Sequence, residues 1–120
     1  DSDSLKNLAT LTKLEELYLD NTLIDDSAGI FLSELKYLES LTVDDTLVGD
    51  VFMSHLRALQ KLEELGIENT KVTNKSEDVI LSFNNLIYLH AYDTLMDEAT
   101  LERLERKVDD NYARYLSTNN

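Results

Sequence analysis

The stretch LEELYLDNTLI (residues 14–24) recurs three times further along the chain, as LESLTVDDTLV (38–48), LEELGIENTKV (62–72) and LIYLHAYDTLM (86–96). Successive copies begin 24 residues apart, and a second apolar set between them keeps the same spacing. The apolar columns are Leu14/Leu38/Leu62/Leu86, Leu17/Leu41/Leu65/Leu89, Leu19/Val43/Ile67/Ala91, Ile24/Val48/Val72/Met96, Leu8/Leu32/Leu56/Ile80/Leu104 and Leu11/Leu35/Leu59/Phe83. A period that holds in this many columns indicates a repeat architecture.

Each 24-residue unit predicts one short strand followed by one short helix. Residues 17–19 alternate between two apolar side chains and one that can face water, which is the pattern of a strand with one buried face. Residues 26–35 carry apolar side chains at helical spacing behind an expected N-cap at Asp26 or Ser27. Since neither element can bury its apolar face alone, successive units must stack, with a parallel sheet on one side and helices on the other.

The acidic segment VDDT (residues 43–46) invites a catalytic or metal-binding interpretation, which the repeat argues against. It occupies the same place as LDNT, IENT and AYDT in the other units, so its acidity belongs to a structural column. The threonine of each copy stands where the chain leaves the strand, and its hydroxyl is expected to bond backbone groups of the turn and of stacked neighbours.

Other candidates for chemistry are weak. His90 has no serine or cysteine partner nearby in the pattern, and three glycines in the whole chain cannot build a phosphate-binding loop. The opening DSDS lacks the later ligands of a calcium loop. We therefore expect no enzymatic activity, no cofactor and no metal.

The repeat unit resembles that of leucine-rich repeat proteins, which reads LxxLxLxxN/CxL followed by a variable segment. The match extends over residues 2–106, with threonine in place of the usual asparagine in all four units. The resemblance implies an α/β right-handed solenoid, with its parallel sheet on the concave face and its helices on the convex face. It also implies that the concave face binds another protein.

The two ends depart from the period. Leu5, Leu8 and Leu11 fit the helical half of a preceding unit, so residue 1 begins in mid-repeat, as a small cap or as the remainder of a longer array. Repeats then begin near residues 11, 35, 59 and 83. At the other end Leu101, Leu104, Val108, Tyr112 and Tyr115 follow helical spacing, which predicts a C-terminal capping helix. We thus expect a solenoid over residues 1–106, and the end of the capping helix with a tail over residues 107–120.

Composition limits the partners. Eleven basic residues face 24 acidic ones in 120 residues, a net charge of −13, which predicts repulsion from nucleic acids and from anionic membranes. A basic protein partner fits this charge. The chain contains no cysteine, no recognisable signal peptide and no membrane-spanning apolar run, which favours the cytoplasm, although its start at Asp1 suggests a processed segment and leaves the compartment unassigned.

The outward positions of the expected strands are the candidate site. We call them the sheet face; it holds five carboxylates, several aromatic side chains and no lysine or arginine. Ser40 and Gly66 complete the face, and Gly66 is expected to leave a gap beside His90. The predicted partner-binding residues are Glu16, Tyr18, Asp20, Thr42, Asp44, Glu64, Glu68, Tyr88, His90 and Tyr92.

Two interpretations of this face stay open. Asp20, Asp44 and Glu68 would form a row of like charges about 4.8 Å apart, which a basic partner would relieve, or the row is solvated surface. The aromatic residues of the last strand would anchor a partner, or would shield that strand against the capping helix.

We expect a non-catalytic interaction module that binds a basic protein through the sheet face. The main alternative is a structural segment of a larger protein or assembly, whose N-terminal repeat edge packs on further repeats or domains of the same chain. An acidic mimic of DNA and a recruiting arm of an enzyme are further alternatives.

Overall fold

The computed structural model describes residues 2–119 and contains one parallel sheet built from the four copies of the repeat. The strands lie in the order β1-β2-β3-β4, and equivalent residues of successive repeats face one another, as in the row of Leu17, Leu41, Leu65 and Leu89. Pairing therefore advances by one 24-residue unit at each step, as the sequence predicts. The strands are β1 (Glu16–Tyr18), β2 (Ser40–Thr42), β3 (Glu64–Gly66) and β4 (Tyr88–His90).

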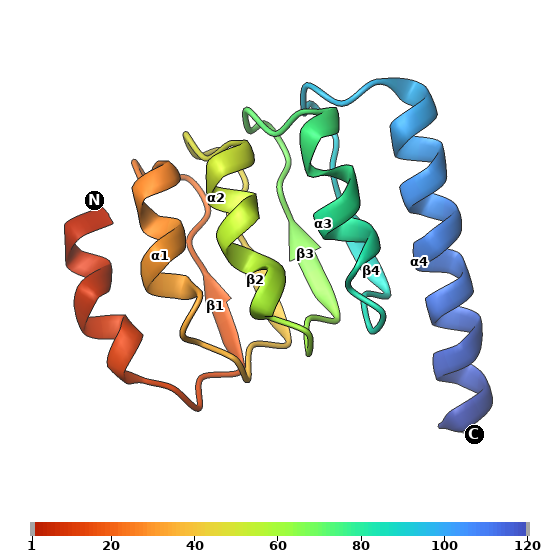
Figure 1. Ribbon diagram of the computed structural model, residues 1–120, viewed down its shortest axis with the longest axis horizontal. Coiled ribbons are helices and arrows are strands. Elements are labelled where there is room, and N and C mark those ends of the chain that lie inside the picture. The colour runs from red at the N-terminus through yellow and green to blue at the C-terminus, as the bar shows by residue number, and fades with distance from the viewer. Residues whose placement is uncertain (1, 120) are drawn as a thin grey trace.

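The helices form a second layer over the sheet, and the repeats follow one another side by side from the N-terminus to the long C-terminal helix (Figure 1). Within each unit the helical segment is short and partly of the 3-10 type. The helical elements are η1 (Ser2–Thr10), η2 (Asp26–Ala28), α1 (Gly29–Leu32), α2 (Asp50–His55), η3 (Leu56–Ala58), η4 (Asn74–Ser76), α3 (Glu77–Leu81) and α4 (Glu98–Thr118).

The helical segments begin slightly earlier than the sequence predicts. In the first repeat the N-cap is Asp25, whose carboxylate accepts a hydrogen bond from the Ser27 amide, so the expectation of Asp26 or Ser27 is wrong. Thr73 and Asp97 occupy the same column and cap η4 and α4. Asp26 is engaged elsewhere: its Oδ1 accepts from the Gly49 amide of the next repeat at 2.6 Å. Which of the two neighbouring aspartates caps the helical segment thus goes together with a contact between repeats, and the pattern within one unit does not reveal that contact.

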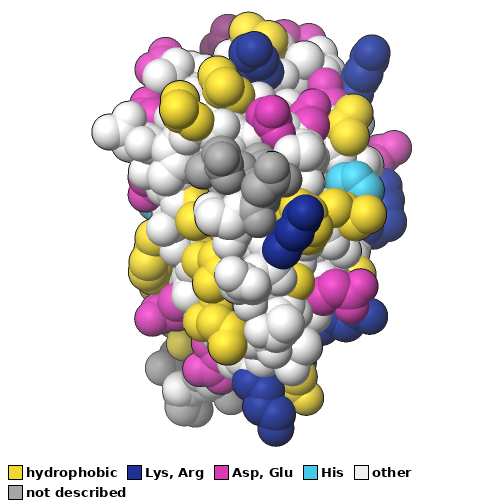
Figure 2. All heavy atoms as spheres, turned by 90° about the vertical axis from the view of Figure 1, so that its left-hand side faces the viewer, with side chains coloured by type: hydrophobic (Ala, Val, Ile, Leu, Met, Phe, Trp, Pro, Cys, Tyr) yellow, Lys and Arg dark blue, Asp and Glu magenta, His cyan; other side chains and the backbone are white. Residues whose placement is uncertain are grey.

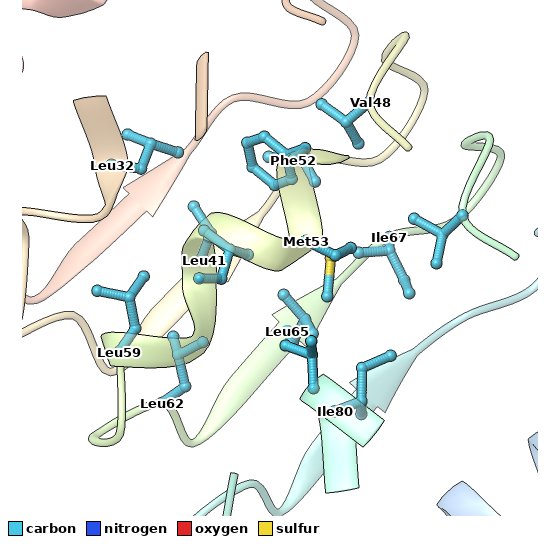
Figure 3. Close-up of a cluster of buried hydrophobic side chains, with 14 of the residues drawn as sticks. Leu32, Leu41, Val48, Phe52, Met53, Leu59, Leu62, Leu65, Ile67 and Ile80 are labelled. Atoms are coloured by element: carbon cyan, nitrogen blue, oxygen red, sulfur yellow. The ribbon is translucent and has the colours of Figure 1, made fainter. Parts of the chain in front are cut away.

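The core lies between the sheet and the helices, where the apolar columns meet. In Figure 3 the side chains of Leu41, Leu65 and Ile67 from the sheet side point toward Phe52 and Met53 of α2. These five side chains are fully buried. The columns are less completely covered at both ends of the stack, because a terminal repeat has a neighbour on one side only.

Helix α4 packs against the last repeat. Leu104 of α4 is fully buried, and the side-chain amide of Asn111 donates to the Phe83 and Leu86 carbonyls at 3.2 and 2.9 Å. The rings of Tyr112 and Tyr88 meet edge to face, with centroids 6.2 Å apart. The long helix expected from the spacing of apolar residues is thus present, and the domain division expected between residues 106 and 107 lies within it.

The opposite end is covered incompletely by η1. Leu5 is buried against the first repeat and Leu8 partly so, but Leu11 is 50% exposed, whereas Leu35, Leu59 and Phe83 of its column are fully buried. Figure 2, which views this end, shows hydrophobic side chains among acidic and basic ones. Leu11 is therefore an apolar position left open at the N-terminal end of the stack.

Candidate interaction surface

A left-handed turn follows every strand, and this turn explains the acidic appearance of VDDT. Its residues have φ values of 52° to 58° and are Asn21, Asp45, Asn69 and Asp93. Among residues with side chains, asparagine and aspartate adopt this conformation most readily. The threonine that follows donates its hydroxyl to the carbonyl three residues earlier, as from Thr46 to Val43 at 2.7 Å. Asp45 therefore serves the geometry of the turn. The sequence analysis predicted a structural role for this column but did not identify the left-handed turn as the reason.

The carboxylates that precede these turns connect successive repeats. Asp20 accepts from the Asp44 amide through Oδ1 at 2.8 Å and from the Thr42 hydroxyl through Oδ2 at 3.0 Å. Asp44 accepts in the same way from the Glu68 amide at 2.8 Å. The expected row of like charges is thus also a ladder of hydrogen bonds that runs from repeat to repeat.

These bonds alter the availability of two predicted site residues. Thr42 was expected to be exposed, but it is only 6% exposed and its hydroxyl is engaged by Asp20, so that expectation is wrong. Burial raises the pKa of Asp44 above its ordinary value. The hydrogen bond from the Glu68 amide acts in the opposite direction, the charges of Asp20 and Glu68 add to the rise, and His90 lowers it.

The middle of the sheet face is filled. His90 stands opposite Gly66 in the sheet. Its imidazole lies 3.1 Å from the carboxylate of Glu64, which is the diagonal neighbour on β3. A Cβ atom on Gly66 would stand 2.9 Å from Cγ2 of Thr42 and 3.0 Å from Oδ1 of Asp44. The gap expected beside His90 is therefore absent, because the side chains of the neighbouring strand already occupy it.

The other predicted residues differ in exposure. Glu16 and Tyr18 lie exposed on β1, and the Tyr18 hydroxyl is 3.3 Å from Glu16. Partial desolvation of the phenol by its neighbours, followed by the charge of Glu16, raises the pKa of Tyr18. Tyr88 contacts α4 through Tyr112, which is the shielding arrangement. Tyr92 is 79% exposed and is not used in that way.

Three basic side chains of the described region make contacts away from this face. Lys61 stands over the Tyr37 ring at 4.5 Å, at the edge where the chain enters the strands. On α4, Arg103 forms a bidentate pair with Glu77 at 2.6 and 3.0 Å, and Lys107 donates to Asn84 at 2.8 Å. Each of these three basic side chains thus has a partner outside the sheet face.

A groove beside the sheet face was not predicted. It lies between the last repeat and α4, has a volume of about 310 Å³ and includes Ala91 and Tyr92 in its lining. The sequence holds one signal for it, because Ala91 is the small residue in a column otherwise made of Leu19, Val43 and Ile67.

Among the side chains of the described residues, no group of three or more histidine, cysteine, aspartate or glutamate residues is placed to hold a metal ion. No helix within that part of the chain is long and apolar enough to cross a membrane.

Comparison with solved structures places the fold among leucine-rich-repeat-type proteins. Internalin C2 of Listeria monocytogenes superimposes with a TM-score of 0.68 and 29% identity over 82% of this chain, which spans 42% of the internalin chain. The Leiomodin-1 segment named Actin-Binding Site 2 gives 0.66 and 18% identity over 99% of this chain and 80% of its own. The tropomodulin C-terminal domain of Caenorhabditis elegans gives 0.66 and 17% over 99% and 98%.

The sequence itself matches no family model and no curated protein. The structural likeness nevertheless confirms the mixed α/β repeat fold that the resemblance implied, a fold used in protein binding.

Proposed function

We propose that the protein is a non-catalytic interaction module that binds a basic protein through the sheet face. The proposed contact residues are Glu16, Tyr18, Asp20, Thr42, Asp44, Glu64, Glu68, Tyr88, His90 and Tyr92. Within this set Asp20, Asp44 and Thr42 hold neighbouring strands together, so direct contact falls mainly on the more exposed side chains. The proposal includes a right-handed solenoid with a concave sheet face, in which threonine replaces the usual asparagine of each repeat and α4 serves as the C-terminal cap.

The observation that carries the proposal is the separation of charge. The sheet face holds five carboxylates and no lysine or arginine, although the chain contains eleven basic residues. Such a field attracts cationic protein segments and speeds their association. Burial is the main cause of the raised pKa of Asp44, and repulsion from Asp20 and Glu68 adds to it; a cation nearby would relieve that repulsion. The same charge would repel nucleic acids and anionic membranes, which the proposal excludes as partners.

A structural role in a larger protein is the second candidate. It is favoured by Leu11 at the N-terminal end, which is half-exposed although its column counterparts Leu35, Leu59 and Phe83 are fully buried; a preceding repeat would cover it. This role and protein binding through the sheet face can coexist, since they use different surfaces.

The test is a salt-titrated capture of proteins from a native extract by the wild-type chain and by Glu16→Lys/Glu68→Lys. The carboxylates of Glu16 and Glu68 do not accept the hydrogen bonds that join successive repeats. The variant therefore reverses charge, while the Asp44 and Glu68 amides keep their bonds to Asp20 and Asp44. We expect a basic protein to be retained by the wild type, released as salt rises and lost from the variant.

The matched control is Glu34→Lys/Asp110→Lys, which changes net charge equally at exposed positions outside the sheet face. This control should retain the partner. Equal loss from both variants would show that only total charge matters, and capture by neither wild type nor control would refute the proposal. Circular dichroism of each variant verifies that the fold is intact.

A further inference from the structure

The groove between β4 and α4 has an apolar floor and an acidic edge. Its floor is lined by side chains from the last repeat and from α4, namely Leu89, Ala91, Leu101 and Val108. Its edge carries the carboxylates of Glu98, Glu102 and Glu105, with the exposed ring of Tyr92 beside them. No lysine or arginine is among the described residues that line it.

The floor exists because one repeat column contains an alanine. Val43 and Ile67, which precede Ala91 in that column, are fully buried, whereas Ala91 and Leu89 remain partly exposed. Ala91 lacks the outer carbon atoms that its counterparts place over the core, and α4 does not fill the space that results. The volume of about 310 Å³ is enough for apolar side chains of a peptide, and lies at the lower end of ligand pockets, roughly 300–1,000 Å³.

The edge is acidic because α4 separates its charges. Glu98, Glu102 and Glu105 follow spacings of four and three residues and so share one side of the helix. Arg103 and Arg114 lie on the side that meets α3 and the loop after it, where Arg103 pairs with Glu77 and Arg114 donates to the Asn84 carbonyl. Arg106 follows Glu102 by one turn and is exposed, and it forms no ion pair with Glu102 among the described residues. The three glutamates have no basic partner in the part of the chain that the structure describes. They are therefore free to pair with cations from outside.

We propose that this groove binds a peptide segment of the protein partner in which an apolar side chain is flanked by lysine or arginine. The apolar side chain fills the space above Ala91, and its basic neighbours pair with the glutamates of α4. A second copy of this chain is disfavoured as the occupant, because two chains of net charge −13 repel one another. The inference rests on the proposed function, which supplies the basic character of the partner. It adds a second contact site, the groove beside α4, to the proposed sheet face.

The experiment uses a labelled peptide with Leu-Phe between pairs of lysines, and a second peptide of equal charge with Gly-Ser in place of Leu-Phe. By fluorescence anisotropy at low salt, we expect the first peptide to bind wild-type protein about ten-fold more tightly than the second. Ala91→Ile restores a large side chain in the column and should abolish this preference while leaving the melting temperature equal or higher. Methyl NMR signals of Leu89, Ala91, Leu101 and Val108 should shift on addition of the Leu-Phe peptide.

A variant that changes only the edge complements this one. Glu102→Lys/Glu105→Lys should weaken binding of both peptides, and Glu34→Lys/Asp110→Lys should weaken it less. Since the NMR measurement uses the wild-type protein, it remains decisive even if Ala91→Ile folds poorly.

The outcomes separate the two proposals. Loss of binding in Glu16→Lys/Glu68→Lys but not in Ala91→Ile would overturn the groove and leave the sheet face standing; the reverse would support the groove and count against the sheet face. Equal affinity for both peptides, or methyl shifts elsewhere only, would overturn the groove. So would a wild-type dimer in sedimentation that Ala91→Ile converts to a monomer, because a second copy would then be the occupant.

Discussion

At the scale of single residues, carboxylates that look alike in the sequence have opposite environments. Asp50 accepts from the Thr73 amide, the Thr73 hydroxyl and the Ser76 hydroxyl at 3.0, 2.6 and 2.6 Å. Burial acts to raise the pKa of Asp50, but these hydrogen bonds outweigh it, and the pKa lies below its ordinary value. Asp44 has its pKa raised, by burial first and by neighbouring carboxylates next. Relative to the unfolded chain, folding thus favours the ionised form of Asp50 and disfavours the ionised form of Asp44.

This contrast predicts opposite responses to pH. Because the folded-state pKa of Asp50 lies below its unfolded value, its stabilisation is present above that unfolded value and is lost as pH falls through the folded pKa. Asp50→Asn should therefore lower the free energy of unfolding by about 1 kcal/mol at pH 7, with the difference from wild type vanishing in acid. Urea denaturation from pH 2 to pH 7 measures the difference.

Asp44→Asn is the matched variant for that experiment. It keeps an oxygen acceptor for the Glu68 amide and removes a charge that the fold disfavours, so the variant should be as stable as wild type or more stable at pH 7. Because the raised folded-state pKa penalises the ionised form above the unfolded value, this advantage should disappear as pH falls below that value. If both variants lowered the free energy of unfolding at pH 7, or both raised it, the opposite roles assigned to Asp50 and Asp44 would be contradicted.

At the scale of elements, α4 depends on a buried amide as well as on its apolar stripe. Asn111 is nearly fully buried and donates to two backbone carbonyls in the segment that joins α3 to β4. These carbonyls lie beyond the end of α3, and that of Phe83 also accepts from the Leu86 amide at 3.2 Å. An asparagine thus supports the docking of α4 in a position where the amphipathic pattern alone would place a leucine.

Asn111→Ala should destabilise the protein by about 1–3 kcal/mol, because it removes two buried hydrogen bonds and takes the side-chain donor away from the Leu86 carbonyl. Urea unfolding followed by circular dichroism measures the loss, and Asp110→Ala, an exposed neighbour on the same helix, should change stability little. Similar losses in the two variants would show that helix propensity, and not the buried hydrogen bonds, accounts for the effect.

At the scale of the whole molecule, the stack is held by contacts between nearest neighbours. Leu41 and Leu65 in the central repeats are fully buried, and Leu17 in the first repeat is only half-buried. The hydrogen bonds from Asp20 to Asp44 and from Asp44 to Glu68 also run from one repeat to the next. Interior repeats therefore carry more of the stability than terminal ones.

Alanine substitution of a fully buried and of a half-buried leucine in the same column tests whether interior repeats carry more of the stability. Leu65→Ala should cost about 2–5 kcal/mol, the range for a large cavity in a packed core. Leu17→Ala should cost clearly less, since less of its surface is removed from water and water can enter the space. Equal costs, measured by chemical denaturation, would show that the end repeats are as tightly packed as the middle.

Much of the fold follows from the period. Columns such as Leu41 and Leu65 predicted the strands, their parallel pairing, their register and the buried face, because side chains of one column must face the same way when units stack. The spacing of Leu101, Leu104 and Val108 predicted α4. The predictions for the sheet face were less complete: Thr42 is buried, and the gap expected at Gly66 is filled.

By itself, the sequence determined the repeat unit, the order of stacking, the core and the absence of lysine and arginine from the outward strand positions. Only the tertiary structure decided that Asp20 and Asp44 hydrogen-bond to amides of the next repeat, that Asn21 and its counterparts adopt left-handed turns, and that α4 leaves a groove over Ala91. The reason is physical. A period records which side chains share a face, whereas hydrogen bonds and cavities depend on distances between atoms of different repeats, which exist only once the units have stacked.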